Sequence, residues 1–167
     1  MKKLIVIILL LLPAIGYSFE NAIWLSISPS QTKPNFSMGI RGKEWGGELG
    51  FVNNFDFSSD TILNYSIPHS NYTNLGWLNV HQSYGIDVYR YLDINSNSSV
   101  YIGPGFYTRE RRLLAKSNLT DFVYTLATSE KIQMPMSIGL DIYGKQFFYG
   151  CGYHSMRGLN IQFGIVY

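Results

Sequence analysis

The sequence predicts an all-β protein: an eight-stranded antiparallel, up-and-down transmembrane β-barrel preceded by a cleaved signal peptide. Three observations support this fold class. Short segments alternate between apolar and other residues, turn-forming residues separate them, and aromatic residues are abundant, with 13 Tyr, 10 Phe and 3 Trp among 167 residues. After the N-terminal region, no segment reaches the roughly 18 consecutive apolar residues of a spanning helix, so a membrane crossing would use strands.

The N-terminal region has the composition of a secretory signal peptide. Lys2 and Lys3 precede an apolar run over 4–12, which is shorter than the roughly 20 residues that span a bilayer. Small residues follow, and we expect cleavage after Ser18. The alternative is a retained anchor. The prediction therefore divides the chain into a signal peptide, 1–18, and one barrel domain, 19–167.

Composition excludes several classes of function. The 13 basic and 11 acidic residues nearly balance, which gives no basis for nucleic-acid binding. The three histidines show no metal-ligand spacing, so we expect neither a metal nor another cofactor. The single cysteine, Cys151, excludes an internal disulfide and is interpreted as a small apolar side chain on a strand.

Alternating residues predict the first three strands and the connections between them. In the first strand, Ile23, Leu25 and Ile27 share one face. A proline-containing connection precedes the second strand, and Gly42 with Lys43 forms a tight turn before the third. A long connection rich in Asn, Ser, Thr and Tyr follows. The predicted ranges are 21–29, 35–41 and 45–53 for the strands and 54–76 for the long connection.

The same pattern predicts five further strands. An Asn-rich turn separates the fourth from the fifth, a charged loop over 110–120 follows the fifth, and Gly144 with Lys145 ends the sixth. Pro104 and Pro135 fall inside predicted strands, where each removes a backbone donor, so we expect a bulge or a local break. The predicted strands are 77–91, 99–109, 122–142, 147–154 and 159–167.

The last strand carries the clearest motif. Its apolar residues recur at every second position and the chain stops on an aromatic residue; these residues are Leu159, Ile161, Phe163, Ile165 and Tyr167. In this it resembles small bacterial outer-membrane β-barrel proteins of the OmpX and OmpA type. The resemblance implies an outer-membrane location, and a signal at Phe163 and Tyr167 that the outer-membrane assembly machinery reads. It also implies a non-enzymatic structural or surface-interaction role.

The two faces of the predicted strands have different chemistry. In a membrane barrel the apolar face meets lipid, and polar or small residues fill the interior. The charged residues on the second faces must then pair inside, since isolated buried charges are costly. We expect a polar network in a filled lumen without an open pore, formed by Arg41, Glu48, Asp87, Lys131 and Asp141.

The two longest connections follow the third and fifth strands, so both lie at one end of the barrel, which corresponds to the outer side. At this end lies a cluster of three arginines, Arg109, Arg111 and Arg112, which could bind the phosphate groups of lipopolysaccharide. The alternative is that these arginines are simply solvated at the base of the loop. The long loop is the best candidate for binding a surface partner. The alternative is that this loop only covers the end of the barrel and binds no partner. Its aromatic residues are Phe55, Phe57, Tyr65 and Tyr72.

Two other functions remain open. His81 and Ser83 share a strand face, as a base and nucleophile would, but Asp87 lies roughly 13 Å along the strand from His81. Outer-membrane lipid A deacylases carry a His-x-Ser pair near the C-terminus, whereas the C-terminal pair here, His154 and Ser155, is adjacent. A lipid-modifying hydrolase is therefore one alternative. The other is a soluble exported β-barrel that binds a small apolar ligand.

Overall fold

The computed structural model describes residues 21–29, 33–53, 62–63, 70–80 and 82–167. The predicted signal peptide, most of the predicted long loop and His81 lie outside these ranges. Within the described ranges, no helix has the length and apolar character needed to cross a membrane.

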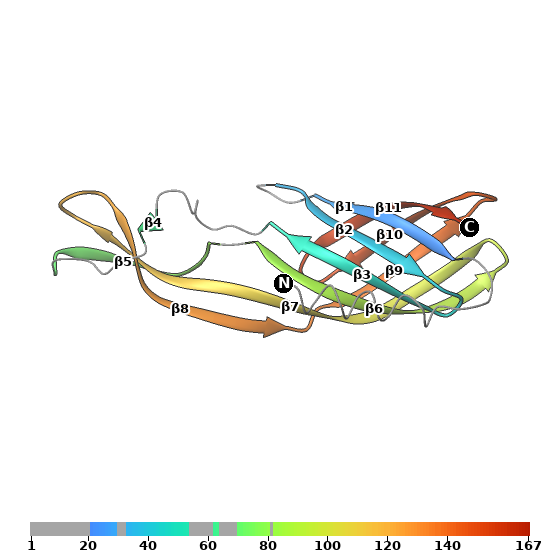
Figure 1. Cartoon of the computed structure of the whole chain (residues 1–167), viewed down its shortest axis with the longest axis horizontal. Coiled ribbons are helices and arrows are strands. Elements are labelled where there is room, and N and C mark those ends of the chain that lie inside the picture. Colours follow the sequence, from blue (N-terminus) through green and yellow to red (C-terminus); the bar gives the residue numbers. More distant parts are fainter. Residues whose placement is uncertain (1–20, 30–32, 54–61, 64–69, 81) are drawn as a thin grey trace.

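Eight strands form a closed antiparallel barrel, which confirms the predicted barrel architecture (Figure 1). Each strand pairs with the next around the barrel, and β11 pairs back with β1. β7 pairs directly with β9, although the chain forms a further strand between them outside the barrel. In order around the barrel the strands are β1 (Ala22–Ser28), β2 (Asn35–Arg41), β3 (Trp45–Val52), β6 (Ser83–Asn95), β7 (Ser98–Ser117), β9 (Met136–Tyr143), β10 (Phe147–His154) and β11 (Gly158–Val166).

The same sheet extends beyond the barrel. The last part of β7 leaves the barrel between β5 (Tyr72–Asn79) and β8 (Val123–Gln133), and β4 (Ile62–Leu63) adds a short parallel pairing to β8. We call β5, β8 and residues 109–117 of β7 the protruding sheet. Figure 1 shows it extending away from the end that holds the C-terminus, which we call the terminal end.

Two predicted boundaries near this sheet were wrong. The predicted fourth strand, 77–91, is two strands, β5 and β6, because the chain leaves the protruding sheet before it enters the barrel. The predicted charged loop, 110–120, is strand as far as Ser117. Its backbone pairs with β5 on one side and β8 on the other, and this long-range pairing overrides the loop-like local composition.

The two prolines behave differently. Met134 and Pro135 separate β8 from β9, as the missing backbone donor of proline led us to expect, and the Pro135 carbonyl accepts a hydrogen bond from the Gly105 amide at 2.8 Å. At Pro104 the strand continues. However, the pairing between β6 and β7 is interrupted where Val88 and Tyr89 lie opposite Pro104 and Gly103.

Side chains alternate between the interior and the exterior of the barrel, as predicted. In β1, Trp24 is buried, whereas Leu25 is 67% exposed. In the last strand Phe163 and Ile165 are more than half exposed, and Ile138 on β9 is 52% exposed. A soluble barrel would bury such residues, so this arrangement opposes the soluble alternative.

Glycines provide the space for aromatic rings inside the barrel. A Cβ added to Gly39 would lie 2.2 Å from Cζ2 of Trp24, and one added to Gly164 would lie 2.2 Å from Cε1 of Phe148. Trp24 and Phe148 themselves meet edge to face, with ring centroids 6.0 Å apart. The interior is thus filled by large side chains that only glycine-lined walls admit.

Candidate functional site

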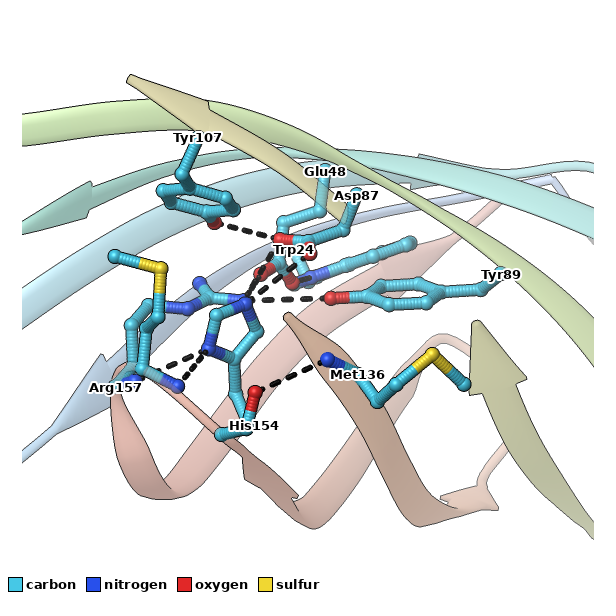
Figure 2. Close-up of polar contacts among 10 residues, drawn as sticks. Trp24, Glu48, Asp87, Tyr89, Tyr107, Met136, His154 and Arg157 are labelled. Carbon is cyan, nitrogen blue, oxygen red and sulfur yellow. Dashed lines mark hydrogen bonds and ion pairs between the residues drawn. The ribbon is translucent and has the colours of Figure 1, made fainter. Parts of the chain in front are cut away.

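The barrel interior holds a buried ionic cluster next to the turn between β10 and β11. Arg157 in this turn points inward and pairs with two carboxylates: Nη2 contacts Oε1 of Glu48, and lies 3.1 Å from Oδ2 of Asp87. All three side chains are fully buried. Figure 2 shows the three side chains converging from β3, β6 and the turn. We call these residues, with Tyr107 and His154, the Arg157 cluster.

Neutral groups complete the solvation of the two carboxylates. The Tyr107 hydroxyl donates to Oδ2 of Asp87 at 2.6 Å, and Nε1 of Trp24 donates to Oε2 of Glu48 at 2.8 Å. Nη2 of Arg157 also donates to the Tyr89 hydroxyl at 3.3 Å. Further hydrogen bonds to its charged atoms stabilise a buried ion pair, and Oδ2 of Asp87 and Oε2 of Glu48 each gain such a donor. Nε and Nη1 of Arg157 have no hydrogen-bond partner among the described residues.

His154 connects this cluster to the backbone of the turn. Its Nδ1 accepts hydrogen bonds from the amides of Met156 at 3.1 Å and Arg157 at 3.0 Å. Since Nδ1 is an acceptor, the ring proton lies on Nε2, which donates to Oδ1 of Asp87 at 3.1 Å. Both ring nitrogens therefore serve to position the turn and Asp87.

A second polar cluster lies toward the terminal end. Arg41 donates through Nη1 to Oγ of Ser99 at 2.8 Å and to the Tyr143 hydroxyl, and its Nη2 pairs with Asp93 at 2.9 Å. The guanidinium also lies 4.0 Å from the centre of the Tyr91 ring. Tyr143 in turn donates to Oδ2 of Asp141 at 3.1 Å, which links this carboxylate to the Arg41 cluster.

The structure places four of the five expected network residues inside the barrel: Arg41, Glu48, Asp87 and Asp141 are all buried. Lys131 does not join them, because it lies exposed on β8, beyond the barrel. The cation that pairs with Glu48 and Asp87 is instead Arg157, which the sequence pattern assigned to a turn. The one available signal was the excess of inward-facing carboxylates, which required another buried cation.

The geometry does not support a hydrolase at His154 and Ser155. Both nitrogens of His154 are engaged, and the ring is fully buried. Ser155 is exposed, and its Oγ accepts a hydrogen bond from the Met136 amide at 3.0 Å. Of the other candidate pair, Ser83 is buried and His81 lies outside the described residues.

The arginine cluster is divided between the two faces of the protruding sheet. Arg109 and Arg111 are two residues apart on β7 and share one face, and Lys131 lies directly opposite Arg109 on β8. We call Arg109, Arg111 and Lys131 the basic face. Arg112 lies on the other face, where its Nε pairs with Glu110 at 2.7 Å.

Local hydrogen bonds hold the arginines of the basic face. Nε of Arg109 donates to Oδ1 of Asn79 at 2.7 Å, and Nη2 of Arg111 donates to the Trp77 carbonyl at 2.8 Å. Neither of these two acceptors is a carboxylate. Two cations directly opposite each other on a sheet repel, so the Arg109 and Lys131 pair favours the approach of an anion.

The other residues with an expected role are those of the long loop and of the assembly signal, and the ones within the described ranges lie on the surface. Tyr72 is exposed at the start of β5, while Phe55, Phe57 and Tyr65 lie outside the described residues. Phe163 is exposed on the barrel exterior and Tyr167 at the terminal end, where its amide donates to the Asn21 carbonyl at 2.9 Å. Recognition of Phe163 and Tyr167 by assembly machinery stays a prediction.

No protein-family model and no curated protein sequence matches the chain. Its fold is similar to solved structures of Ail, the attachment invasion locus protein of Yersinia pestis. The crystal structure has 12% identity and a TM-score of 0.44, covering 90% of this chain and 96% of that one. The structure in a phospholipid nanodisc has 14% identity and a TM-score of 0.48, with 90% and 99% covered.

A third Ail structure, in complex with the heparin analogue sucrose octasulfate, has 12% identity and a TM-score of 0.41, and 88% and 93% of the two chains are covered. At this identity the likeness concerns the fold alone. The barrel itself is established by the strand pairing of this chain.

Proposed function

We propose that this protein is a non-enzymatic barrel of the bacterial outer membrane whose protruding sheet binds phosphate groups of lipopolysaccharide through the basic face. The membrane location is supported by the distribution of side chains, which is the reverse of that in a protein folded in water. Apolar side chains cover the outside of the barrel, while its buried charges pair within. This is the arrangement that a lipid environment stabilises.

An aromatic anchor at the terminal end supports the same location. Trp45 is 55% exposed, and the Arg90 guanidinium lies 4.9 Å from its ring centre. Arg90 also pairs with Glu44 at 2.9 Å. Exposed Trp beside charged groups is typical of the boundary between lipid and water, so this end marks one edge of the membrane.

Connection lengths give the orientation. The connections at the terminal end are short, whereas the protruding sheet arises from the connections at the other end. Outer-membrane barrels have short periplasmic turns and longer extracellular loops. The protruding sheet therefore reaches the cell surface in this proposal, where lipopolysaccharide presents its phosphate groups to Arg109, Arg111 and Lys131.

A pair of matched double variants tests the proposed ligand. Arg109→Gln with Lys131→Gln removes two charges from the basic face, and Arg112→Gln with Lys116→Gln removes two from the opposite face. We expect only the first pair to weaken binding to lipopolysaccharide, by about tenfold or more, because each charge-assisted hydrogen bond contributes about 1.5–3 kcal/mol. Binding is measured on the protein in phospholipid nanodiscs titrated with lipopolysaccharide.

Enzymatic removal of the lipid A phosphates provides the ligand control. The dephosphorylated ligand is expected to bind the unchanged protein as weakly as the phosphorylated ligand binds the first double variant. Equal losses in the two double variants would show that overall charge, and not the basic face, determines binding.

A further inference from the structure

The barrel exterior has a hollow at the terminal end that no part of the proposed surface role uses. It has a volume of about 410 Å³ and is lined by the turn between β9 and β10 and the start of β10: Gly144, Lys145, Gln146, Phe147 and Tyr149. The turn is fixed on both sides. The Gly144 amide donates to the Phe147 carbonyl at 2.7 Å, and the Val166 amide on β11 donates to the Gln146 carbonyl at 2.9 Å.

Ordered aromatic rings form the apolar wall of the hollow. Phe147 stacks on Phe163, with ring centroids 5.7 Å apart and planes at 16°. Tyr149 contacts the same ring at a centroid distance of 5.6 Å. All three side chains lie on the exposed exterior face, so the wall continues the apolar surface that faces lipid in the proposed orientation.

Lys145 provides a positive charge at the edge of this wall. Its side chain is exposed in the turn, and it forms no ion pair or hydrogen bond with another described residue. A lysine here can hold its ammonium group at the level of lipid headgroups while the adjacent aromatic residues contact acyl chains. The hollow thus places a cation at the level of the phosphate group of a lipid and an apolar wall at the level of its acyl chains.

We propose that this hollow binds a glycerophospholipid of the leaflet at the terminal end. Its phosphate group accepts hydrogen bonds from Nζ of Lys145, and one acyl chain lies along Phe147 and Tyr149. The site lies at the opposite end of the barrel from the basic face, and it depends on the proposed membrane location but not on lipopolysaccharide binding. This ligand is favoured because the Lys145 ammonium complements a lipid phosphate and because the aromatic wall is continuous with the apolar exterior of the barrel.

Native mass spectrometry of the full-length protein released from detergent tests the site. The probes are dioleoylphosphatidylglycerol and dioleoylglycerol, which share acyl chains but differ in the phosphate. We expect the unchanged protein to retain one phosphatidylglycerol and not dioleoylglycerol. Lys145→Ala is expected to reduce this retention by about tenfold, and Lys145→Arg to preserve it, since either cation binds phosphate.

Lys43→Ala is the matched control, because Lys43 lies in the turn between β2 and β3, also at the terminal end but outside the hollow. Equal retention in Lys145→Ala and the unchanged protein, an equal loss in Lys43→Ala, or preferential retention of lipopolysaccharide would each overturn the site. A heat-dependent gel shift verifies that each variant is a closed barrel. A protein that does not insert into phospholipid vesicles would overturn the membrane location and this site together, whereas insertion with unselective retention overturns the site alone.

Discussion

At the scale of single residues, Arg157 has the largest influence on the interior. Its guanidinium is the buried cation shared by Glu48 and Asp87, and its backbone amide is held by His154. Removing one partner of a buried ion pair leaves an uncompensated charge, which costs far more than losing a pair on the surface. Arg157, which the sequence pattern places in a turn, is therefore the residue that allows the Glu48 and Asp87 carboxylates to be buried.

The substitution Arg157→Met tests this role, since it keeps much of the side-chain volume and removes the charge. We expect the free energy of unfolding to fall by about 3–5 kcal/mol, because Glu48 and Asp87 are left without their cation. Urea unfolding in phospholipid vesicles, followed by tryptophan fluorescence, measures the change. Arg90→Met is the control and is expected to cost about 1 kcal/mol or less, because its pair with Glu44 is at the surface.

At the scale of elements, β7 has two separate roles. Its first part pairs with β6 and β9 and closes the barrel, while its last part pairs with β5 and β8 in the protruding sheet. The pairing with β6 ends at Thr108 and the pairing with β9 ends at Pro104. Barrel closure therefore does not require the residues of β7 beyond Arg109.

Shortening the protruding sheet tests this independence. Replacing residues 110–130 by Asn-Gly joins Arg109 to its opposite neighbour Lys131 through a two-residue turn, which suits a tight hairpin. We expect the shortened protein to keep the heat-dependent gel shift of a closed barrel. Deletion of Ile102 is the contrasting variant, since a slip of one residue in the barrel part of β7 exchanges its faces and is expected to abolish the shift. Loss of the shift in the shortened protein would show that the protruding sheet is needed for closure.

At the scale of the whole molecule, the distribution of polar and apolar side chains is inverted relative to a protein folded in water. Ile138 is 52% exposed on the outside of β9, while its neighbour Ser137 is buried in the interior. Glycine-lined walls, aromatic rings and the Arg157 cluster fill the interior, and the Arg41 cluster lies toward the terminal end. Lipid contact then stabilises the outside, and internal pairing stabilises the inside.

Ile138→Arg tests the assigned membrane contact. An arginine on the lipid-facing side near the midplane is expected to lower the free energy of unfolding in vesicles by about 2–4 kcal/mol. Thr120→Arg, at an exposed position of the turn between β7 and β8, is the control and is expected to change it by about 0.5 kcal/mol or less. Similar costs at both positions would mean that Ile138 does not face lipid.

The sequence by itself determined the barrel class, the facing of each barrel strand and the burial of Arg41, Glu48, Asp87 and Asp141, because side-chain alternation is a local property of a strand. Only the tertiary structure decided that residues 110–117 continue β7, that Arg157 and not Lys131 neutralises the interior, and that Arg112 is separated from Arg109 and Arg111. These outcomes depend on which strands pair and in which register. Such long-range pairing gives a charged segment, or a turn residue, partners that its local sequence does not reveal.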